Sequence, residues 1–380
     1  MRYEQFKATL LEKHEGKNQG IPISTKLPQL RKILTSFAPG ESILLCGGTG
    51  VSKSRWTVKH VIIDSLKSMI ENPNGMKVRV LYNTLEISSM EIYLMVCSYL
   101  FKTKLKKYYS REQMLNLLGD KQVNTEFFED LEKIRPSLEF LSTWVTIVED
   151  CRTPTAWFKY CEKVLLDLGT VVNGKYVKKN PNIHVIIVTD TLNSFTSEKN
   201  ETKLIGMTKF SSDYNKMFLR NFYQCTTVTL QQLSKDSQTQ MWSNTGKKVE
   251  EKLVPTSENL KDYRSSPDDS STVLAIFAPA RHGLKKWEGY DVELFGNKLL
   301  FLYSLKANFS ELIKPIPLYA ELGWLHFEEI PDNYKEPTLY EAFLKQHNLI
   351  TTGVNLLQSP AKLQFQQLFN KEENGTIELE

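Results

Sequence analysis

Two kinds of apolar pattern alternate along residues 21–331 of the chain. Short runs that are apolar throughout predict strands covered on both faces, as in the interior of a parallel sheet. The most apolar of these runs is IHVIIVTD at residues 183–190. We expect further strands at residues 42–48, 77–85, 144–150, 226–233, 271–279, 298–306, 316–322 and 324–330.

Between most of these runs, apolar residues repeat with the spacing of a helix. We expect helices near residues 4–14, 28–37, 54–70, 89–102, 111–119, 125–134, 155–168 and 205–222, and a weak helix at 338–346. The alternation predicts an α/β fold with a mostly parallel, twisted sheet and helices on both faces. The last strands follow one another closely, so we expect an antiparallel edge there.

The pattern also divides the chain into three segments. Residues 1–20 predict a short helix and a linker, residues 21–331 the main domain, and residues 332–380 a peripheral tail. Within the domain, residues 234–271 are rich in Ser, Thr, Lys, Asp and Asn, which predicts one long, mobile excursion.

Composition narrows the class of protein. The 380 residues are 41% hydrophobic and 24% charged, which is typical of a globular protein with a sizeable core. The net charge of +4 is too small to establish a nucleic-acid partner and permits one if the excess is local. The five cysteines form no C-x-x-C pair and the six histidines are scattered, so we expect neither a disulfide framework nor a zinc site. The N-terminus lacks the pattern of a signal peptide and no apolar run is long enough to span a membrane, which favours a cytoplasmic location without a membrane partner.

A phosphate-binding loop is the strongest motif. It lies between a predicted strand and a predicted helix and consists of Gly47, Gly48, Thr49, Gly50, Val51, Ser52, Lys53 and Ser54. Glycines let backbone N–H groups converge on a phosphate, and the helix that follows adds the positive end of its dipole. We expect Lys53 to reach the β- and γ-phosphates of ATP and Ser54 to ligate Mg²⁺. Ser52 stands where the usual pattern has glycine, so a loop that binds ATP and turns it over slowly, or a turn that binds nothing, remains an alternative.

Three polar residues follow predicted strands at places suited to catalysis. Asp190 ends the most apolar strand, where a carboxylate can hold Mg²⁺ through water, although many strands end in Asp as a turn or cap. Glu86 could polarise the attacking water or could simply favour the start of a helix. Gln232 could contact the γ-phosphate or could be an ordinary polar strand end.

These pieces, in this order, resemble the C-terminal ATPase domain of DnaB-type replicative helicases. The likeness covers residues 21–331 and includes LYNTLEISSMEI, VIIVTDTLNSF, VTLQQLSK and the closing strands IPLYAELGWLHFEEIP. It implies a RecA-like P-loop NTPase fold, ATP and Mg²⁺ as ligands, and a homo-oligomer, namely a hexameric ring. It also implies that Glu86 is the catalytic glutamate, Asp190 the Walker B aspartate and Gln232 the sensor glutamine.

The sequence departs from this family at the arginine finger, the residue that reaches into the neighbouring subunit's site. Ala307 stands where the arginine is expected, and Lys306 is the adjacent cation. A lysine lacks the planar fork of a guanidinium. Arg281, Lys285 and Lys286 precede this strand and are possible substitutes.

The resemblance also places two loops on single-stranded DNA. They carry Lys199, Lys203, Lys235, Lys247, Lys248 and Lys252, together with Trp242. Lysines neutralise phosphates and an aromatic ring stacks on bases. The alternative is a solvated loop, because Asp236, Glu250 and Glu251 dilute the charge.

The function that these patterns imply is an ATP-dependent DNA helicase that moves on single-stranded DNA, with a primase or a helicase loader as a further partner. A compact helicase of this kind is typical of a phage-like replicon, which would place it in a bacterial host's cytoplasm. Two alternatives remain: a catalytically weakened, RecA-like ATP-binding accessory protein, and a RecA-like recombinase that forms filaments.

Overall fold

The computed structural model describes residues 3–14, 20–117, 119, 121–234, 253–308 and 310–350. Nine strands of this part form one sheet in the order β15-β14-β13-β10-β3-β9-β8-β4-β5. Their bounds are β3 Ser42–Gly47, β4 Lys77–Thr84, β5 Val145–Val148, β8 Ile183–Asp190, β9 Thr226–Gln232, β10 Thr272–Phe277, β13 Leu299–Ala307, β14 Ile316–Glu321 and β15 His326–Glu329.

The sheet has a parallel part and an antiparallel part. From β5 to β10 every neighbouring pair is parallel, whereas β13, β14 and β15 add to β10 as an antiparallel edge. The runs that are apolar throughout became the strands β3, β8, β9 and β10, which are buried along nearly their whole length. The predicted α/β architecture, with a mostly parallel sheet and an antiparallel edge, is therefore confirmed.

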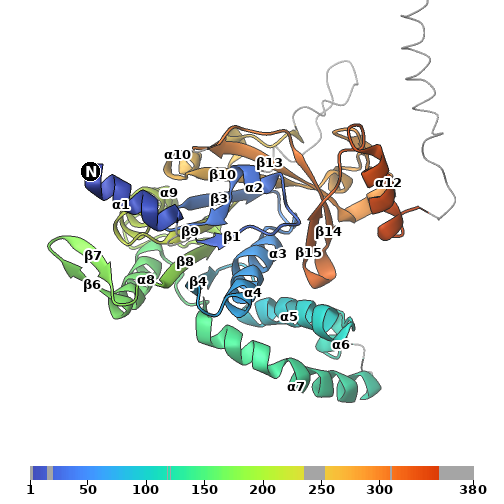
Figure 1. The fold of residues 1–380 in the computed structure, drawn as a ribbon, viewed down its shortest axis with the longest axis horizontal. Coiled ribbons are helices and arrows are strands. Elements are labelled where there is room, and N and C mark those ends of the chain that lie inside the picture. The colour runs from blue at the N-terminus through green and yellow to red at the C-terminus, as the bar shows by residue number, and fades with distance from the viewer. Residues whose placement is uncertain are drawn as a thin grey trace, which may run out of the picture.

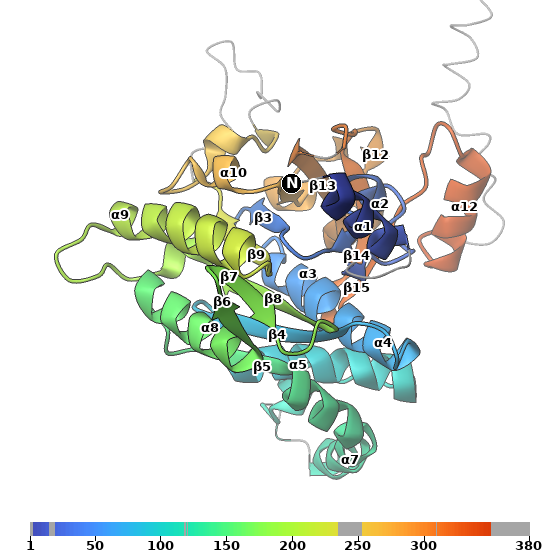
Figure 2. The same cartoon turned by 60° about the vertical axis from the view of Figure 1, so that its left-hand side comes forward.

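Helices cover both faces of this sheet (Figures 1 and 2). The first face carries α3 Lys53–Thr57, η1 Val58–Ile63, α4 Asp64–Glu71, α5 Ser89–Leu100, η2 Phe101–Leu105, α6 Arg111–Met114 and α7 Lys121–Trp144. The second face and its margins carry α8 Pro154–Leu168, η3 Leu192–Ser194, α9 Lys203–Thr208, η4 Lys209–Phe222, η7 Ser257–Asn259, α10 Ser266–Asp269, η8 Pro279–His282, α11 Val292–Phe295, η9 Gly296–Lys298 and α12 Pro337–Gln346.

Alternation along the strands divides the core between the two faces. In β3, Ile43 and Leu45 pack with Trp56 of α3 on the first face. Leu44 and Cys46 belong to a second cluster. That cluster includes residues of α12, of which Leu344 is fully buried. Helix α12 therefore packs on the sheet, although it lies in the segment that the sequence suggested to be peripheral.

Several shorter elements complete the described fold. They are α1 Tyr3–His14, β1 Ile21–Pro22, α2 Leu30–Ile33, β2 Ser36–Phe37, β6 Gly169–Val172, β7 Lys175–Lys178, β11 Lys286–Trp287, β12 Tyr290–Asp291 and η10 Leu322–Trp324. Helix α1 confirms the predicted N-terminal helix, and its apolar side chains Phe6, Leu10 and Leu11 are exposed. No helix in the described part of the chain is both long and apolar enough to cross a membrane.

Four predicted elements differ from the structure. The helix expected at residues 28–37 is only α2, because the chain becomes extended at Leu34 and Phe37 pairs with Ile21 in a small antiparallel ladder. The helix expected at 111–119 ends at Met114. The helix expected at 125–134 is part of the much longer α7, which continues through Pro136 to Trp144. The strand expected at 144–150 is the shorter β5, which begins only after α7 ends.

Candidate functional site

The P-loop leaves the end of β3 and enters α3, as the sequence predicts. A Cβ atom at Gly47 would lie 2.6 Å from Cγ2 of Val51 and 2.9 Å from the carbonyl oxygen of Ile276, so only glycine fits there. Gly50 has a φ of 74°, in the left-handed region. Gly47 thereby lies close against strand β10, and Gly50 allows the loop to turn beneath the Arg281 side chain.

Ser52 adopts a left-handed backbone conformation in this loop. Its φ is 75° and its ψ is 27°, at the position where P-loops usually have glycine. A Cβ atom makes this conformation unfavourable by about 1–2 kcal/mol. The Ser52 hydroxyl is buried and has no hydrogen-bond partner among the described residues. The loop therefore has the backbone conformation of a P-loop, although Ser52 is strained in it.

Substitution of Ser52 by glycine is expected to raise the free energy of unfolding by about 1 kcal/mol, because it removes this strain. Urea unfolding of the two proteins measures the difference. A matched control is Ser68→Gly, because Ser68 lies in the right-handed helix α4, where glycine is expected to cost about 1 kcal/mol. Equal changes at the two positions would contradict the strain at Ser52.

Lys53 places a buried positive charge inside the loop. Its side chain is 6% exposed, and its Nζ atom donates to the carbonyl oxygens of Gly47 at 3.0 Å and Gly48 at 2.9 Å. Burial lowers the pKa of the Lys53 ammonium, and the negative charges of Glu86 and Asp190 oppose this shift. The ammonium lies where it can exchange the two carbonyl oxygens for phosphate oxygens.

Asp190 ends β8 and is completely buried beside this ammonium. Burial raises the pKa of its carboxyl to about 6, although the hydroxyl groups of Ser54 and Tyr82 oppose the shift. The Tyr82 hydroxyl donates to Oδ2 at 2.7 Å, whereas Oδ1 has no hydrogen-bond partner in the described part of the chain. A buried carboxylate oxygen without a partner, beside the Ser54 hydroxyl, fits a divalent cation such as Mg²⁺.

Without divalent metal, Asp190→Asn is expected to raise the free energy of unfolding at neutral pH by about 2–3 kcal/mol. The folded wild type binds a proton at Asp190 up to about pH 6 and the unfolded chain only up to its ordinary value, so ionisation destabilises the fold as the pH rises through this window. The gain should therefore vanish below about pH 4.

Urea unfolding in the presence of a chelator, at several pH values, measures this gain. Asp269→Asn is the matched control, because interactions with Lys216 and Ser211 lower the pKa of the Asp269 carboxyl despite its burial. This control should lose stability at neutral pH. A loss of stability in Asp190→Asn as well would contradict the unfavourable burial of the Asp190 charge.

Glu86 and Gln232 meet although 146 positions separate them. The Gln232 amide donates a hydrogen bond to Oε1 of Glu86, and the hydroxyl groups of Thr191 and Ser194 lie 3.3 and 3.4 Å from the same oxygen. The exposed Glu86 carboxylate follows β4, and Gln232 ends β9 beside Gly47 of β3. The predicted catalytic and sensor side chains are thus gathered with the P-loop at one edge of the sheet.

Comparison with known proteins identifies the fold. No protein-family model matches the chain, and no curated protein matches it in sequence. The solved ATPase domain of G40P is similar in structure, with a TM-score of 0.60 and 12% identity over 86% of this chain and 98% of that domain. A DnaB-like replicative helicase, solved with its interactions with primase, gives a TM-score of 0.55 and 13% identity over 86% of this chain and 67% of its own. The chain has the RecA-like fold of DnaB-type helicase ATPase domains.

In this RecA-like domain, Lys306 lies away from its own P-loop. The ladders pair Lys306 with Val273 and Val273 with Leu44, three residues before Gly47, so Lys306 lies about 10 Å further down the sheet. Its Nζ atom donates to the carbonyl oxygen of Pro267 at 2.8 Å. Lys306 therefore has no access to the nucleotide site of its own chain.

Arg281 instead lies against its own P-loop. Its Nη1 atom donates to the carbonyl oxygen of Thr49 at 3.1 Å, and the guanidinium covers Gly50. Lys285 forms an exposed ion pair with Glu293. Lys286 is exposed on β11. Of the three cations considered as substitutes for the finger, Arg281 is thus the one that contacts the nucleotide-binding loop of the same chain.

The predicted DNA-binding lysines are only partly within the described residues. Lys199 is exposed, and Lys203 lies 3.7 Å from Asp262 in an exposed ion pair. The other predicted lysines, Lys235, Lys247, Lys248 and Lys252, lie outside the described residues, as does Trp242.

Sequence reasoning missed two residues that organise the site. Tyr82 holds Asp190, and its position two residues before the end of β4, an inner strand beside β8, is the signal that was available. Asn193 accepts a hydrogen bond from the backbone N–H of Gln232 at 2.7 Å and donates to the carbonyl oxygen of Lys261 at 2.9 Å. Asn193 thereby links the loop after β8 to the end of β9.

Proposed function

We propose that the chain is an ATP-dependent helicase motor of DnaB type that hydrolyses ATP between subunits and moves on single-stranded DNA. The observation that carries the proposal is the meeting of Lys53, Asp190, Glu86 and Gln232 at the carboxyl edge of the parallel strands. Ligands of such sheets bind at this edge.

Each residue has a distinct task in this proposal. Lys53 and the amides of the P-loop bind the phosphates, and Ser54 and Asp190 hold Mg²⁺, which neutralises charge that develops on the phosphate oxygens. Glu86 orients the attacking water and accepts its proton. Gln232 already bonds to Glu86 and starts the segment that leads towards the proposed DNA loop, so it can report the state of the γ-phosphate.

A second subunit is part of the proposal, because Lys306 lies away from the P-loop of its own chain. Its place at the opposite end of the sheet favours a contact with the nucleotide of a neighbouring subunit. Helix α1 also supports assembly, since Phe6, Leu10 and Leu11 are 49%, 41% and 54% exposed. The proposed assembly is a hexameric ring, and the proposed additional partner is a primase or a helicase loader.

Contact with DNA rests on the loops that follow β8 and β9. Lys199 and Lys203 lie in or beside the first loop, at the same edge of the sheet as the catalytic residues. A change of nucleotide state at Glu86 and Gln232 can reach this loop through Asn193.

The test is the ATP hydrolysis rate with and without single-stranded DNA at low salt, alongside the mass of the assembly with Mg·ATP. The proposal predicts DNA-stimulated turnover and a ring-sized particle. Unstimulated turnover in a monomer would contradict it. Filaments on DNA, seen by electron microscopy, would favour a recombinase.

Two observations favour a second function, a weakened motor that acts as an ATP-binding accessory protein. Ser52 strains the P-loop, and Ala307 occupies the position expected for the finger. Such a protein binds Mg·ATP and assembles, but it neither turns over ATP appreciably nor responds to DNA. Nucleotide affinity measured beside turnover separates the two functions.

A further inference from the structure

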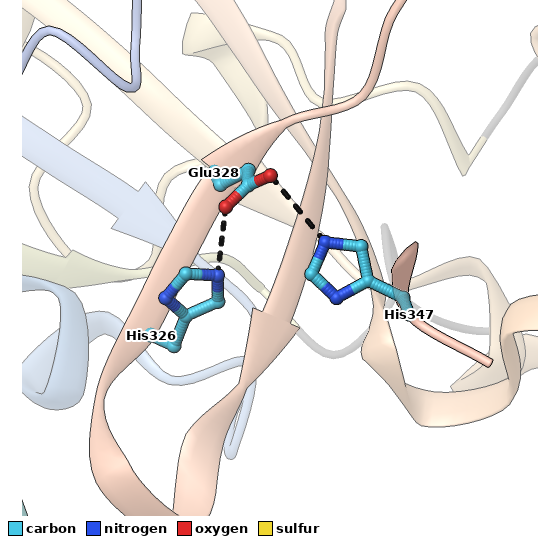
Figure 3. A group of neighbouring side chains, drawn as sticks. All are labelled: His326, Glu328 and His347. Carbon is cyan, nitrogen blue, oxygen red and sulfur yellow. Dashed lines mark hydrogen bonds and ion pairs between the residues drawn. The ribbon is translucent and has the colours of Figure 1, made fainter. Parts of the chain in front are cut away.

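A group of two histidines and a carboxylate lies at the antiparallel edge of the sheet, on β15 and at the end of α12 (Figure 3). His326 and Glu328 are two residues apart on β15, so their side chains share one face. His347 directly follows α12 and faces them. The ligating atoms of all three lie within 4.8 Å of one another.

Both imidazoles present the same atom to the carboxylate. Nε2 of His326 lies 2.9 Å from Oε2 of Glu328, and Nε2 of His347 lies 3.4 Å from Oε1. Neighbouring ligands in a tetrahedral zinc site are about 3.3 Å apart, given bonds of about 2.0–2.1 Å. The Glu328 carboxylate therefore lies at nearly this distance from each imidazole, and the ligating atoms of the whole group lie within 4.8 Å of one another.

His326 contributes a buried nitrogen to this group. Its side chain is about nine-tenths buried, at 8% residue exposure, and Nε2 makes no hydrogen bond of acceptable geometry within the described part of the chain. This buried nitrogen points at Glu328 nevertheless. A buried imidazole nitrogen that faces a carboxylate in an ion pair, without a well-directed hydrogen bond, is placed so that the two groups can share a cation.

The surroundings hold the two imidazole rings in place. Trp324 stacks on His326 with ring centres 4.6 Å apart. The rings of Tyr319 and Phe343 pack on His347, with their centres 4.2 and 4.4 Å from the centre of the imidazole ring. Side chains fixed in this way need little reordering to bind an ion, which favours affinity.

We propose that His326, Glu328 and His347 form a binding site for a divalent transition-metal ion of the Zn²⁺ type. Two imidazole nitrogens and one carboxylate oxygen suit Zn²⁺ better than Mg²⁺ or Ca²⁺, which prefer oxygen ligands. Water would complete the coordination. The ion would fasten the end of α12 to β15, where Phe343 and Leu344 already pack on the sheet.

This site is separate from the nucleotide site. Four inter-strand steps separate β15 from β3, which amounts to roughly 20 Å. The bound ion is therefore structural, and its presence does not depend on the proposed helicase function.

Lys26 would compete with a metal ion for the Glu328 carboxylate. Its Nζ atom lies 3.0 Å from Oε2 of Glu328, and its side chain is 54% exposed. An ammonium held by an exposed ion pair contributes little and can turn into solvent when an ion enters. Removal of this charge should therefore tighten metal binding, whereas the loss of a ligand should weaken it.

The test uses the tag-free, full-length protein, stripped with a chelator, incubated with Zn²⁺ and freed of unbound metal by gel filtration. We expect about one zinc ion per chain, and a rise in the unfolding temperature on adding zinc. His347→Gln should weaken zinc binding by at least about 100-fold. Lys26→Ala should tighten it by up to about fivefold.

His14→Gln is the matched control, because His14 lies exposed on α1 and should bind no zinc of its own. Co²⁺ in place of Zn²⁺ adds an absorption spectrum that reports imidazole coordination. The proposal is overturned if neither the wild type nor Lys26→Ala retains zinc, or if His347→Gln retains as much as His14→Gln.

Discussion

Lys53→Ala is expected to lower the rate of ATP hydrolysis by about 10³-fold and to weaken ATP binding. Lys53 is 6% exposed, and its ammonium is held by two backbone carbonyl oxygens of the P-loop, so the alanine variant loses a buried positive charge at the phosphate-binding loop. Charge stabilisation in such a buried site is much stronger than at a surface.

Phosphate release and isothermal titration with Mg·ATP measure the two effects. The control is Lys67→Ala, because Lys67 lies on the same continuous helix and forms only an exposed ion pair with Glu71. That variant should behave as the wild type does. Equal turnover in Lys53→Ala and Lys67→Ala would exclude the P-loop as the source of the activity.

Glu86→Gln is expected to lower turnover by about 10²–10⁴-fold while leaving nucleotide affinity nearly unchanged. Glutamine keeps the size of the side chain and can still accept hydrogen bonds from Gln232, Thr191 and Ser194. It cannot accept the proton of the attacking water. The variant should therefore accumulate in the ATP-bound state.

A single-turnover measurement with bound ATP separates this chemical defect from a defect in binding. Glu71→Gln serves as the control, since Glu71 is an exposed glutamate at the end of α4. A fall in affinity without a fall in the chemical rate would assign Glu86 a structural role, such as favouring the start of a helix.

The parallel half of the fold was predictable because its strands obey one simple rule. A run such as residues 183–190 is apolar throughout since both faces of β8 are covered. The predicted positions of the P-loop and Asp190 follow from the same pattern, because the ends of parallel strands gather at one edge. Glu86 and Gln232 both needed the family resemblance, and the structure then placed the two side chains in contact.

Features that depend on tertiary contacts were not predictable. The apolar spacing of residues 30–37 is helical, yet Phe37 pairs with Ile21 in a strand. The hairpin of β6 and β7 has mostly exposed side chains, so it gives no strong apolar signal. Tyr82 reaches Asp190 from the neighbouring strand β4, and its position near the end of that strand does not by itself reveal the contact.

The histidines show the same limit. Their scattered positions gave no ligand spacing along the chain, and a zinc site was not expected. In the structure, packing of α12 on the sheet brings His347 to β15, where His326 and Glu328 lie. Contacts between distant segments therefore carry information that spacing does not.

The central claim is that the P-loop of this chain binds the triphosphate of a nucleotide. Calorimetric titration of the full-length wild type with Mg·ATP tests it most directly. The account predicts one site per chain with a dissociation constant below about 1 mM, weakened when Mg²⁺ is removed and when Lys53 is replaced by alanine. Absence of binding at Mg·ATP concentrations of about 5 mM, in a protein shown to be folded, would contradict it.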